Sequence, residues 1–311
     1  MSIPRELSRS HGAVLRLLCI HLFFTAACTA SHASVSWASD LAPAPSTTAS
    51  IEGVHHPTPV EPPQQFPDRL SGEYLKSYLT DTGKILTSPG GWDGDSWLKL
   101  GIIASITTGI YLGDSDIRQI AHRNQSPTGA TAAQVGNALG NPFYTGPTLG
   151  LFYLYGHLAD DSRARRTSLL AVESLAISGT FTWTLKEIIQ RPRPGDGVSS
   201  TTWNGPRGDL ADYSFPSGHT TAAFSVASVI AEEYGNNPAV PPLAYGLATL
   251  TGLARIYDDK HWASDAFLGG AIGYFVGKAV VRSHGSPDYF PVRITPIAVR
   301  NGGGLTVEYR Y

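Results

Sequence analysis

Cysteine is nearly absent from this chain of 311 residues, which contains only Cys19 and Cys28. Both lie in an N-terminal segment that we expect to be removed, so the mature protein would have no disulfide bond even in an oxidising compartment. Charge is also scarce, since 15% of the residues are Asp, Glu, Lys or Arg and the formal net charge is -2. A chain without a basic excess is not expected to bind nucleic acid.

Long uninterrupted apolar runs are missing as well. A membrane-spanning helix needs about 20 mostly apolar residues. The runs over residues 98–112, 164–185 and 262–281 are interrupted by hydroxyl or charged side chains, including Glu173 and Asp265. The sequence therefore favours a buried helical bundle in a water-soluble protein. A polar-lined membrane bundle is the alternative, because charges inside a membrane can belong to an active site.

Residues 1–33 are typical of a secretory signal. Arg5, Arg9 and Arg16 precede an apolar run over residues 17–27, which is too short to span a bilayer. Small residues follow, and we expect cleavage after Ala33 and export, most simply to the periplasm. A retained anchor helix or a lipoprotein acylated at Cys28 are the alternatives, and either would make the protein membrane-associated.

The remainder divides into three parts. Residues 34–68 are rich in Pro, Ala, Ser and Thr and predict an extended linker. Over residues 69–283, apolar residues recur at spacings of three and four, which predicts an all-α domain. The expected helices cover residues 71–80, 95–112, 131–139, 144–158, 164–190, 219–234, 240–257 and 262–282. In residues 284–311, two alternating stretches flank a glycine-rich turn and predict a C-terminal β-hairpin.

The first of three clusters suited to phosphate is KEIIQRPRP, which begins at Lys186. On a helix, Lys186, Gln190 and Arg193 would share one face before the prolines end the helix. A lysine charge beside an arginine fork suits a tetrahedral oxyanion. A solvated basic helix end is the alternative, and Arg191 is the residue expected to lie at the surface.

The second cluster is SFPSGHTT, residues 214–221, which precedes an apolar helical run. A helix N-terminus offers free backbone N–H groups and the positive end of a dipole. Gly218 lets a ligand approach those groups, and Ser217 can cap the helix or bond the ligand. The pattern predicts an anion seat with His219 beside it, although an ordinary serine-capped helix would have the same sequence.

The third cluster is RIYDDKHWASD, which begins at Arg255. His261 and Asp265 are four residues apart, so on a helix the carboxylate could hold the imidazole N–H and fix its tautomer. Both residues could instead be structural at a helix start. Residues 258–260 are expected to form a solvated loop, because the acidic run does not match a calcium loop and no histidine pair has zinc spacing.

In this order the three clusters resemble the signature of the type 2 phosphatidic acid phosphatase and vanadium haloperoxidase superfamily. The resemblance runs by motif from Lys186 to Asp265 and implies a helical-bundle fold. One departure is Ala254, which stands where the family usually has serine. This departure affects a helper hydrogen bond and no reacting group.

The resemblance also implies a role for each site residue. His261 would be the nucleophile that becomes a phosphohistidine, Asp265 would orient it, and His219 would be the general acid and then the base. The phosphoryl oxygens would be held by Lys186, Arg193, Ser217, Gly218 and Arg255. No metal or other cofactor is expected, because cations and N–H groups can neutralise the developing charge.

The sequence thus predicts a metal-independent phosphatase that acts on phosphate monoesters or diphosphates. The substrate could be a lipid phosphate, an isoprenoid diphosphate or a soluble ester, and a membrane surface is a possible partner. A vanadate-dependent haloperoxidase and a non-catalytic phosphate-binding protein are the alternatives. The oligomeric state is not predicted.

Overall fold

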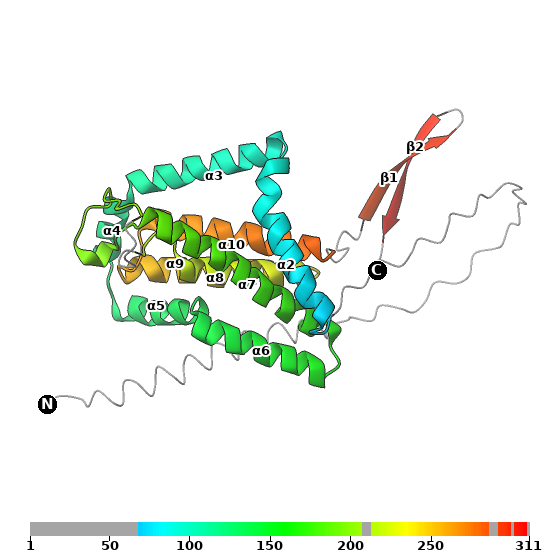
Figure 1. Cartoon of the computed structure of the whole chain (residues 1–311), viewed down its shortest axis with the longest axis horizontal. Helices are drawn as coiled ribbons and strands as arrows, with labels where there is room; N and C mark the ends of the chain where they lie inside the picture. Colours follow the sequence, from blue (N-terminus) through cyan, green and yellow to red (C-terminus); the bar gives the residue numbers. More distant parts are fainter. Residues whose placement is uncertain (1–67, 207–212, 286–291, 300–301, 310–311) are drawn as a thin grey trace, which may run out of the picture.

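The computed structural model describes residues 68–206, 213–285, 292–299 and 302–309. The helices are α2 (Gly72–Thr87), α3 (Gly94–Leu112), α4 (Asp114–Arg123), α5 (Pro127–Leu139), α6 (Pro142–Leu158), α7 (Ser162–Ile189), α8 (Gly218–Glu233), α9 (Val240–Tyr257) and α10 (Ala263–Ser283), with short 3-10 helices η1 (Ser88–Gly91) and η2 (Pro194–Asp196). The predicted all-α domain is confirmed (Figure 1). The expected signal segment and all but the last residue of the expected linker lie outside the described residues.

The strands β1 (Val292–Val299) and β2 (Gly302–Tyr309) pair antiparallel, with Val292 opposite Tyr309. They form the hairpin that the alternating tail predicts.

Most helices start and end where the apolar spacing predicts. Short polar side chains set several starts: Asp93 accepts a hydrogen bond from the Ser96 amide at 2.9 Å and caps α3. The sequence analysis missed α4 and ended α2 too early. Helix α4 has only ten residues, few of them apolar, and its one buried residue is Asp114, an acid, so the apolar pattern was too short to recognise.

The centre of the bundle is α8, which packs against α7, α9 and α10 (Figure 1). Glycines let α10 approach the α8 backbone: a Cβ atom at Gly269 would lie 2.5 Å from the Ser217 carbonyl oxygen, and one at Gly273 would lie 2.3 Å from that of Thr221. The second contact lies four residues further toward the C-terminus on both helices, so α8 and α10 run parallel. Their N-terminal ends therefore lie at the same end of the bundle.

Helix α7 runs antiparallel to α8. Two buried hydroxyl pairs fix this direction, Ser174 with Ser225 at 2.5 Å and Thr182 with Thr221 at 3.2 Å. The C-terminal end of α7 consequently meets the N-terminal ends of α8 and α10. The three sequence clusters therefore fall at one end of the bundle.

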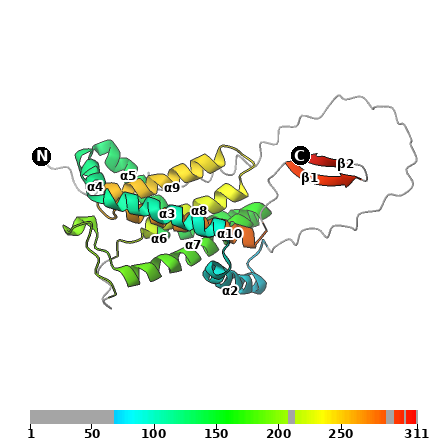
Figure 2. The same ribbon diagram turned by 90° about the horizontal axis from the view of Figure 1, so that it is seen from above.

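The helices α3 and α6 lie on opposite sides of the central helices in Figure 1, and Figure 2 shows the same bundle from above. No residue of α3 is buried, and several of its large apolar side chains are 42–78% exposed: Trp97, Leu98, Leu100, Ile102, Ile106 and Leu112. On α6, Phe143 and Leu158 are exposed as well. Among the described residues, no helix combines the length and the apolar character that crossing a membrane requires.

Candidate active site

The segment after α7 carries the first cluster, but in a different geometry from the one expected. The helix ends at Ile189 because Gln190 takes a left-handed conformation with φ 44°. The expectation that Arg193 shares a helical face with Lys186 is therefore wrong. The proline after Arg191 disfavours helical backbone at that residue, which explains the early end. Arg193 instead precedes η2, and its amide donates to Asp196 at 2.9 Å.

Lys186 reaches from the last turn of α7 toward the second cluster. Its Nζ atom donates a hydrogen bond to the Tyr213 carbonyl oxygen at 2.7 Å. Burial lowers the Lys186 pKa to about 7; the charges of Arg193 and Arg255 also lower it, whereas the Asp265 carboxylate acts in the opposite direction. These charge effects place Lys186 near Arg255 and Asp265 of the third cluster.

The second cluster forms the start of α8, but Ser217 does not cap it. The Ser217 hydroxyl accepts a hydrogen bond from Thr220 Oγ1 at 2.9 Å, while its amide donates to the Asp265 carbonyl oxygen at 2.9 Å. In the described structure no side chain caps the first turn of α8. Its amides, including that of Gly218, therefore suit an anion.

His261 lies just before α10 and is 3% exposed. Its Nδ1 atom is 2.7 Å from the Ser214 carbonyl oxygen. A carbonyl oxygen can only accept, so Nδ1 carries the proton and the neutral ring keeps its lone pair on Nε2. Asp265 Oδ2 is 3.9 Å from Nδ1, beyond hydrogen-bond length, so the expected direct bond is wrong.

Asp265 supports His261 through its neighbours. Its Oδ2 atom accepts hydrogen bonds from the Ser214 hydroxyl and, at 2.9 Å, from the Trp262 amide. The carboxylate thus fixes the residue whose carbonyl holds the imidazole, and it also caps α10. This arrangement orients His261 indirectly.

The two imidazoles are held neutral at neutral pH. Burial lowers the His261 pKa to about 4, against the opposing effect of the Asp265 carboxylate. Burial also lowers the His219 pKa to about 3, and the positive charges of Arg255 and Arg193, together with His261 and Lys186, add to this effect. An anion bound among these cations would offset their charge and raise the His219 pKa.

Arg255, in the last turn of α9, is the third cation of the site. Its Nη1 atom donates to Asn137 Oδ1 at 2.7 Å, which fixes the side chain against α5. Its Nε atom is buried without a hydrogen-bond partner among the described residues. This N–H group is available to a phosphoryl oxygen. The sequence analysis missed Asn137, which lies more than 100 positions away from Arg255 and carries no motif.

Arg191 is the largest correction to the sequence analysis, because it is fully buried and not at the surface. Its guanidinium donates to Asp265 Oδ1 at 2.6 Å and to Asp114 Oδ2 at 2.8 Å. It also donates to the Ser264 hydroxyl and the Ser200 carbonyl oxygen. Asp114 in turn accepts from the Ser264 amide at 2.9 Å. One arginine therefore joins α4 and α10 beneath the site.

Three aromatic rings enclose this guanidinium. The Arg191 Cζ atom lies 4.7 Å from the ring centroid of Trp203 and 5.1 Å from those of Tyr111 and Trp262. Arginine stacks well on such faces, which exclude water from the ion pairs.

The loop before His261 is also better fixed than expected. Asp259 is bound by Arg118 through Nε and Nη2 at 2.9 and 2.7 Å, and His122 Nε2 lies 2.9 Å from its Oδ2 atom. The expectation of a solvated loop is wrong for Asp259, which ties the loop to α4. The Asp259 carboxylate thus forms an ion pair with Arg118.

Arg191→Met should destabilise the protein by about 3–5 kcal/mol, because it leaves two buried carboxylates without their partner. Denaturant unfolding of this variant and of Arg123→Ala would measure the difference. Arg123 is an exposed arginine at the end of α4, and its removal should be nearly neutral. Equal stability of Arg191→Met and wild type would show that the buried network is energetically unimportant.

Comparison with known proteins agrees with the motifs. The Lipid A 1-phosphatase of Porphyromonas gingivalis is 43% identical over 74 residues, which cover 24% of this chain and 16% of that protein. Two solved structures are similar: Aquifex aeolicus LpxE, at 22% identity, covers 54% of this chain and 93% of its own with a TM-score of 0.43. The first transmembrane PAP2 type phosphatidylglycerolphosphate phosphatase from Bacillus subtilis, at 15% identity, covers 67% and 92% with a TM-score of 0.41.

The family model described as the PAP2 superfamily matches residues 167–287. This segment holds all three clusters and the helices that position them. Over this segment, the chain is similar to the PAP2 superfamily.

Proposed function

We propose that this protein is a phosphatase that cleaves phosphate from a phosphorylated lipid through a phosphohistidine intermediate. The observation that carries the proposal is the state of His261: its Nδ1 atom is engaged by the Ser214 carbonyl oxygen at 2.7 Å, so Nε2 is free to act as a nucleophile. Three cations, Lys186, Arg193 and Arg255, belong to the same site.

In the first step, His261 Nε2 attacks phosphorus, and the bond from phosphorus to the leaving alcohol oxygen breaks. His219 donates a proton to that oxygen. The bound anion allows His219 to hold this proton, because it offsets the cations that otherwise lower its pKa. Asp265 favours the positive charge on the His261 ring, whose Nδ1 atom is 3.9 Å from the carboxylate.

In the second step, His219 removes a proton from water, and the hydroxide oxygen attacks phosphorus. The bond between phosphorus and His261 Nε2 breaks, which releases inorganic phosphate and restores the neutral ring. Both steps gather charge on the phosphoryl oxygens. The cationic side chains and the first-turn amides of α8, including Gly218, would stabilise that charge without a metal ion.

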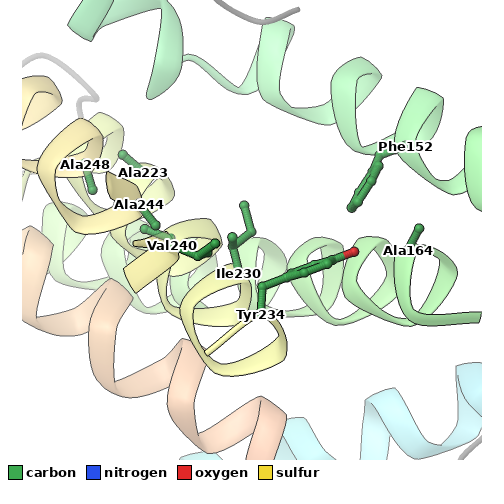
Figure 3. Close-up of a cluster of buried hydrophobic side chains, with 9 residues drawn as sticks. Phe152, Ala164, Ala223, Ile230, Tyr234, Val240, Ala244 and Ala248 are labelled. Carbon is green, nitrogen blue, oxygen red and sulfur yellow. The ribbon is translucent and has the colours of Figure 1, made fainter. Parts of the chain in front are cut away.

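An apolar cavity of about 80 Å³ supports a lipid substrate. Its walls come from α5, α6, α7, α8 and α9, and they include Leu139, Phe152 and Ala223. Ala223 follows His219 by one helical turn, so the cavity begins directly along α8 from the site. The residue after Leu139 is Gly140, where a Cβ atom would lie 2.6 Å from the His219 carbonyl oxygen. Figure 3 shows Phe152 and Ala223 among the buried apolar side chains here.

The outer surfaces of α3 and α6 support contact with a membrane. Soluble proteins rarely expose so many large apolar side chains together, and Trp97, Leu98 and Phe143 are all more than half exposed. We propose that these two helices contact lipid and that the substrate reaches the site from there. The relative named Lipid A 1-phosphatase and the exported state predicted from residues 1–33 agree with this location.

The proposed roles of His261 as nucleophile and His219 as general acid and base are directly testable. The substrate is nitrophenyl phosphate with radioactive phosphorus, and the reaction is stopped by denaturation at alkaline pH, where a phosphohistidine is stable. His219→Ala should accumulate labelled protein, because nitrophenol leaves with little protonation while water attack becomes slow. Its turnover should fall by about 100- to 10,000-fold. His261→Ala should neither turn over nor become labelled. If label is retained in His261→Ala and absent from His219→Ala, the assignment is wrong and His219 is the nucleophile.

His157→Ala is the matched control, since His157 is an exposed histidine at the end of α6 and should label and turn over as wild type does. The same preparations should release phosphate in the presence of EDTA and be inhibited by vanadate. Halide oxidation that depends on vanadate and peroxide, without phosphate release, would instead establish the haloperoxidase alternative.

The pH dependence of kcat/KM should be bell-shaped and acidic. His261 must be neutral to attack, so activity should rise with pH through about 4. Lys186 must be charged to hold phosphate, so activity should fall as pH rises through about 7. In Lys186→Arg the part of the alkaline limb that comes from Lys186 should disappear, because arginine stays charged, and only loss of the His219 proton should still lower activity. An unchanged alkaline limb in this variant would assign it to another group.

Filling the apolar cavity should affect lipid substrates selectively. Ala223→Leu should raise KM for a long-chain lipid phosphate by about 10-fold or more, by analogy with losing a few buried methylene groups at about 0.8 kcal/mol each. Its kcat/KM for nitrophenyl phosphate should stay near wild type. Ala132→Leu adds the same volume at an exposed position of α5, away from α3 and α6, and should change neither value. Equal loss on both substrates would show that the cavity does not bind the lipid chain.

A further inference from the structure

A second group of titratable side chains lies at the end of the bundle away from the candidate active site. Asp81 belongs to α2, Glu173 to α7, and His284 follows α10; the three are 3%, 0% and 1% exposed. One ligand atom from each lies within 4.8 Å of the others. Because α10 has 21 residues at about 1.5 Å each, this group is about 30 Å from His261. The proposed phosphatase mechanism uses none of these residues.

The distances within the group suit a shared cation. His284 Nε2 lies 3.1 Å from Asp81 Oδ2 and 3.0 Å from Glu173 Oε2. A single N–H group points well at only one acceptor, whereas an imidazole lone pair and two carboxylates can all converge on one metal ion. In addition, Glu173 Oε1 is buried and has no hydrogen-bond partner among the described residues. This orphaned oxygen is an independent sign that a ligand is bound here.

Neighbouring side chains support the two carboxylates. The Tyr74 hydroxyl donates to Glu173 Oε2 at 3.0 Å, and Lys84 Nζ lies 3.0 Å from Asp81 Oδ1. Hydrogen bonds of this kind usually orient metal-binding carboxylates.

The packing of α2 shows what such an ion would do. The two buried residues of α2 are Tyr74 and Asp81, and both reach this group. Its apolar residues Leu75 and Leu79 are more than half exposed, and Ile85 is only partly buried where it packs against the core, so few apolar contacts attach this helix. Figure 1 shows α2 crossing the end of the bundle opposite α4. The contacts of Tyr74 and Asp81 therefore fasten α2 to α7 and α10.

We propose that Asp81, Glu173 and His284 bind a divalent transition-metal ion, with Zn²⁺ the best match, and that this ion fastens α2 to the bundle. One imidazole and two carboxylates form a ligand set that zinc accepts and that magnesium, which prefers oxygen ligands, does not favour. The ion would compensate the charge of the two buried carboxylates, in addition to Lys84 beside Asp81.

Metal content and stability of the purified full-length chain test the proposal. Elemental analysis should find one zinc ion per chain after growth in zinc-supplemented medium. Stripping with a chelator should lower the midpoint of thermal unfolding, and Zn²⁺ should restore it whereas Mg²⁺ should not. Nitrophenyl phosphate hydrolysis should survive stripping at temperatures where the stripped chain stays folded. Loss of hydrolysis under those conditions would place the ion in the chemistry and overturn a structural role.

Conservative variants identify the ligands. Glu173→Gln and Asp81→Asn keep the side-chain shape and should lose the ion. His157→Asn and the double variant His55→Asn/His56→Asn, which removes the histidine pair outside the described residues, should keep it. Zinc retained in both carboxylate variants, or lost from either control, would overturn the assignment.

A wild-type measurement keeps the proposal falsifiable if the variants do not fold. X-ray absorption of the zinc-loaded chain should show oxygen and nitrogen ligands at about 2.0–2.2 Å with a single imidazole. Two or more imidazoles, or no bound zinc at all, would contradict the proposal. In the latter case a protonated His284 would itself join the two carboxylates.

Discussion

The buried guanidinium of Arg191 is the interaction on which the candidate site depends. It binds Asp265 and Asp114 at 2.6 and 2.8 Å with no exposure to water. Removing one partner of such a pair is costly, because a buried charge then has no compensation. Asp265 in turn fixes Ser214, and the Ser214 carbonyl oxygen fixes the His261 ring. The proposed reactivity of His261 therefore depends on a residue that it does not contact.

The bundle supplies the second constraint. The glycines of α10 bring its backbone against α8, and the Ser217 amide binds the Asp265 carbonyl oxygen at 2.9 Å. This contact joins the anion seat at the start of α8 to the start of α10. Because α7 runs in the opposite direction, Lys186 reaches the same place. Local sequence provides the reactive groups, and helix direction brings them together.

The sequence predicted well what depends on local pattern. Helix positions followed from apolar spacing, and the side chains proposed to react or to hold phosphate all lie within short motifs, from Lys186 to Asp265. It failed where a role depends on a distant partner. Arg191 was assigned to the surface because nothing nearby in the sequence reveals Asp114, which lies 77 positions earlier.

Two local details also failed for physical reasons. The helix expected to carry Arg193 ends at Ile189, since the proline after Arg191 prevents its continuation. The expected bond from Asp265 to His261 assumed that both residues lie on α10, but the helix begins at Ala263 and His261 precedes it. Residue spacing alone could not show that His261 Nδ1 would bond the Ser214 carbonyl oxygen instead of the Asp265 carboxylate.

The central claim is that His261 is a neutral ring protonated on Nδ1, and nitrogen-15 NMR of the histidine rings tests it most directly. At pH 6, above the lowered His261 pKa of about 4, the account predicts a neutral ring with the proton on Nδ1 and a bare Nε2. Assignment would come from the resonance lost in His261→Ala. A doubly protonated ring, or a neutral ring with its proton on Nε2, would contradict the account.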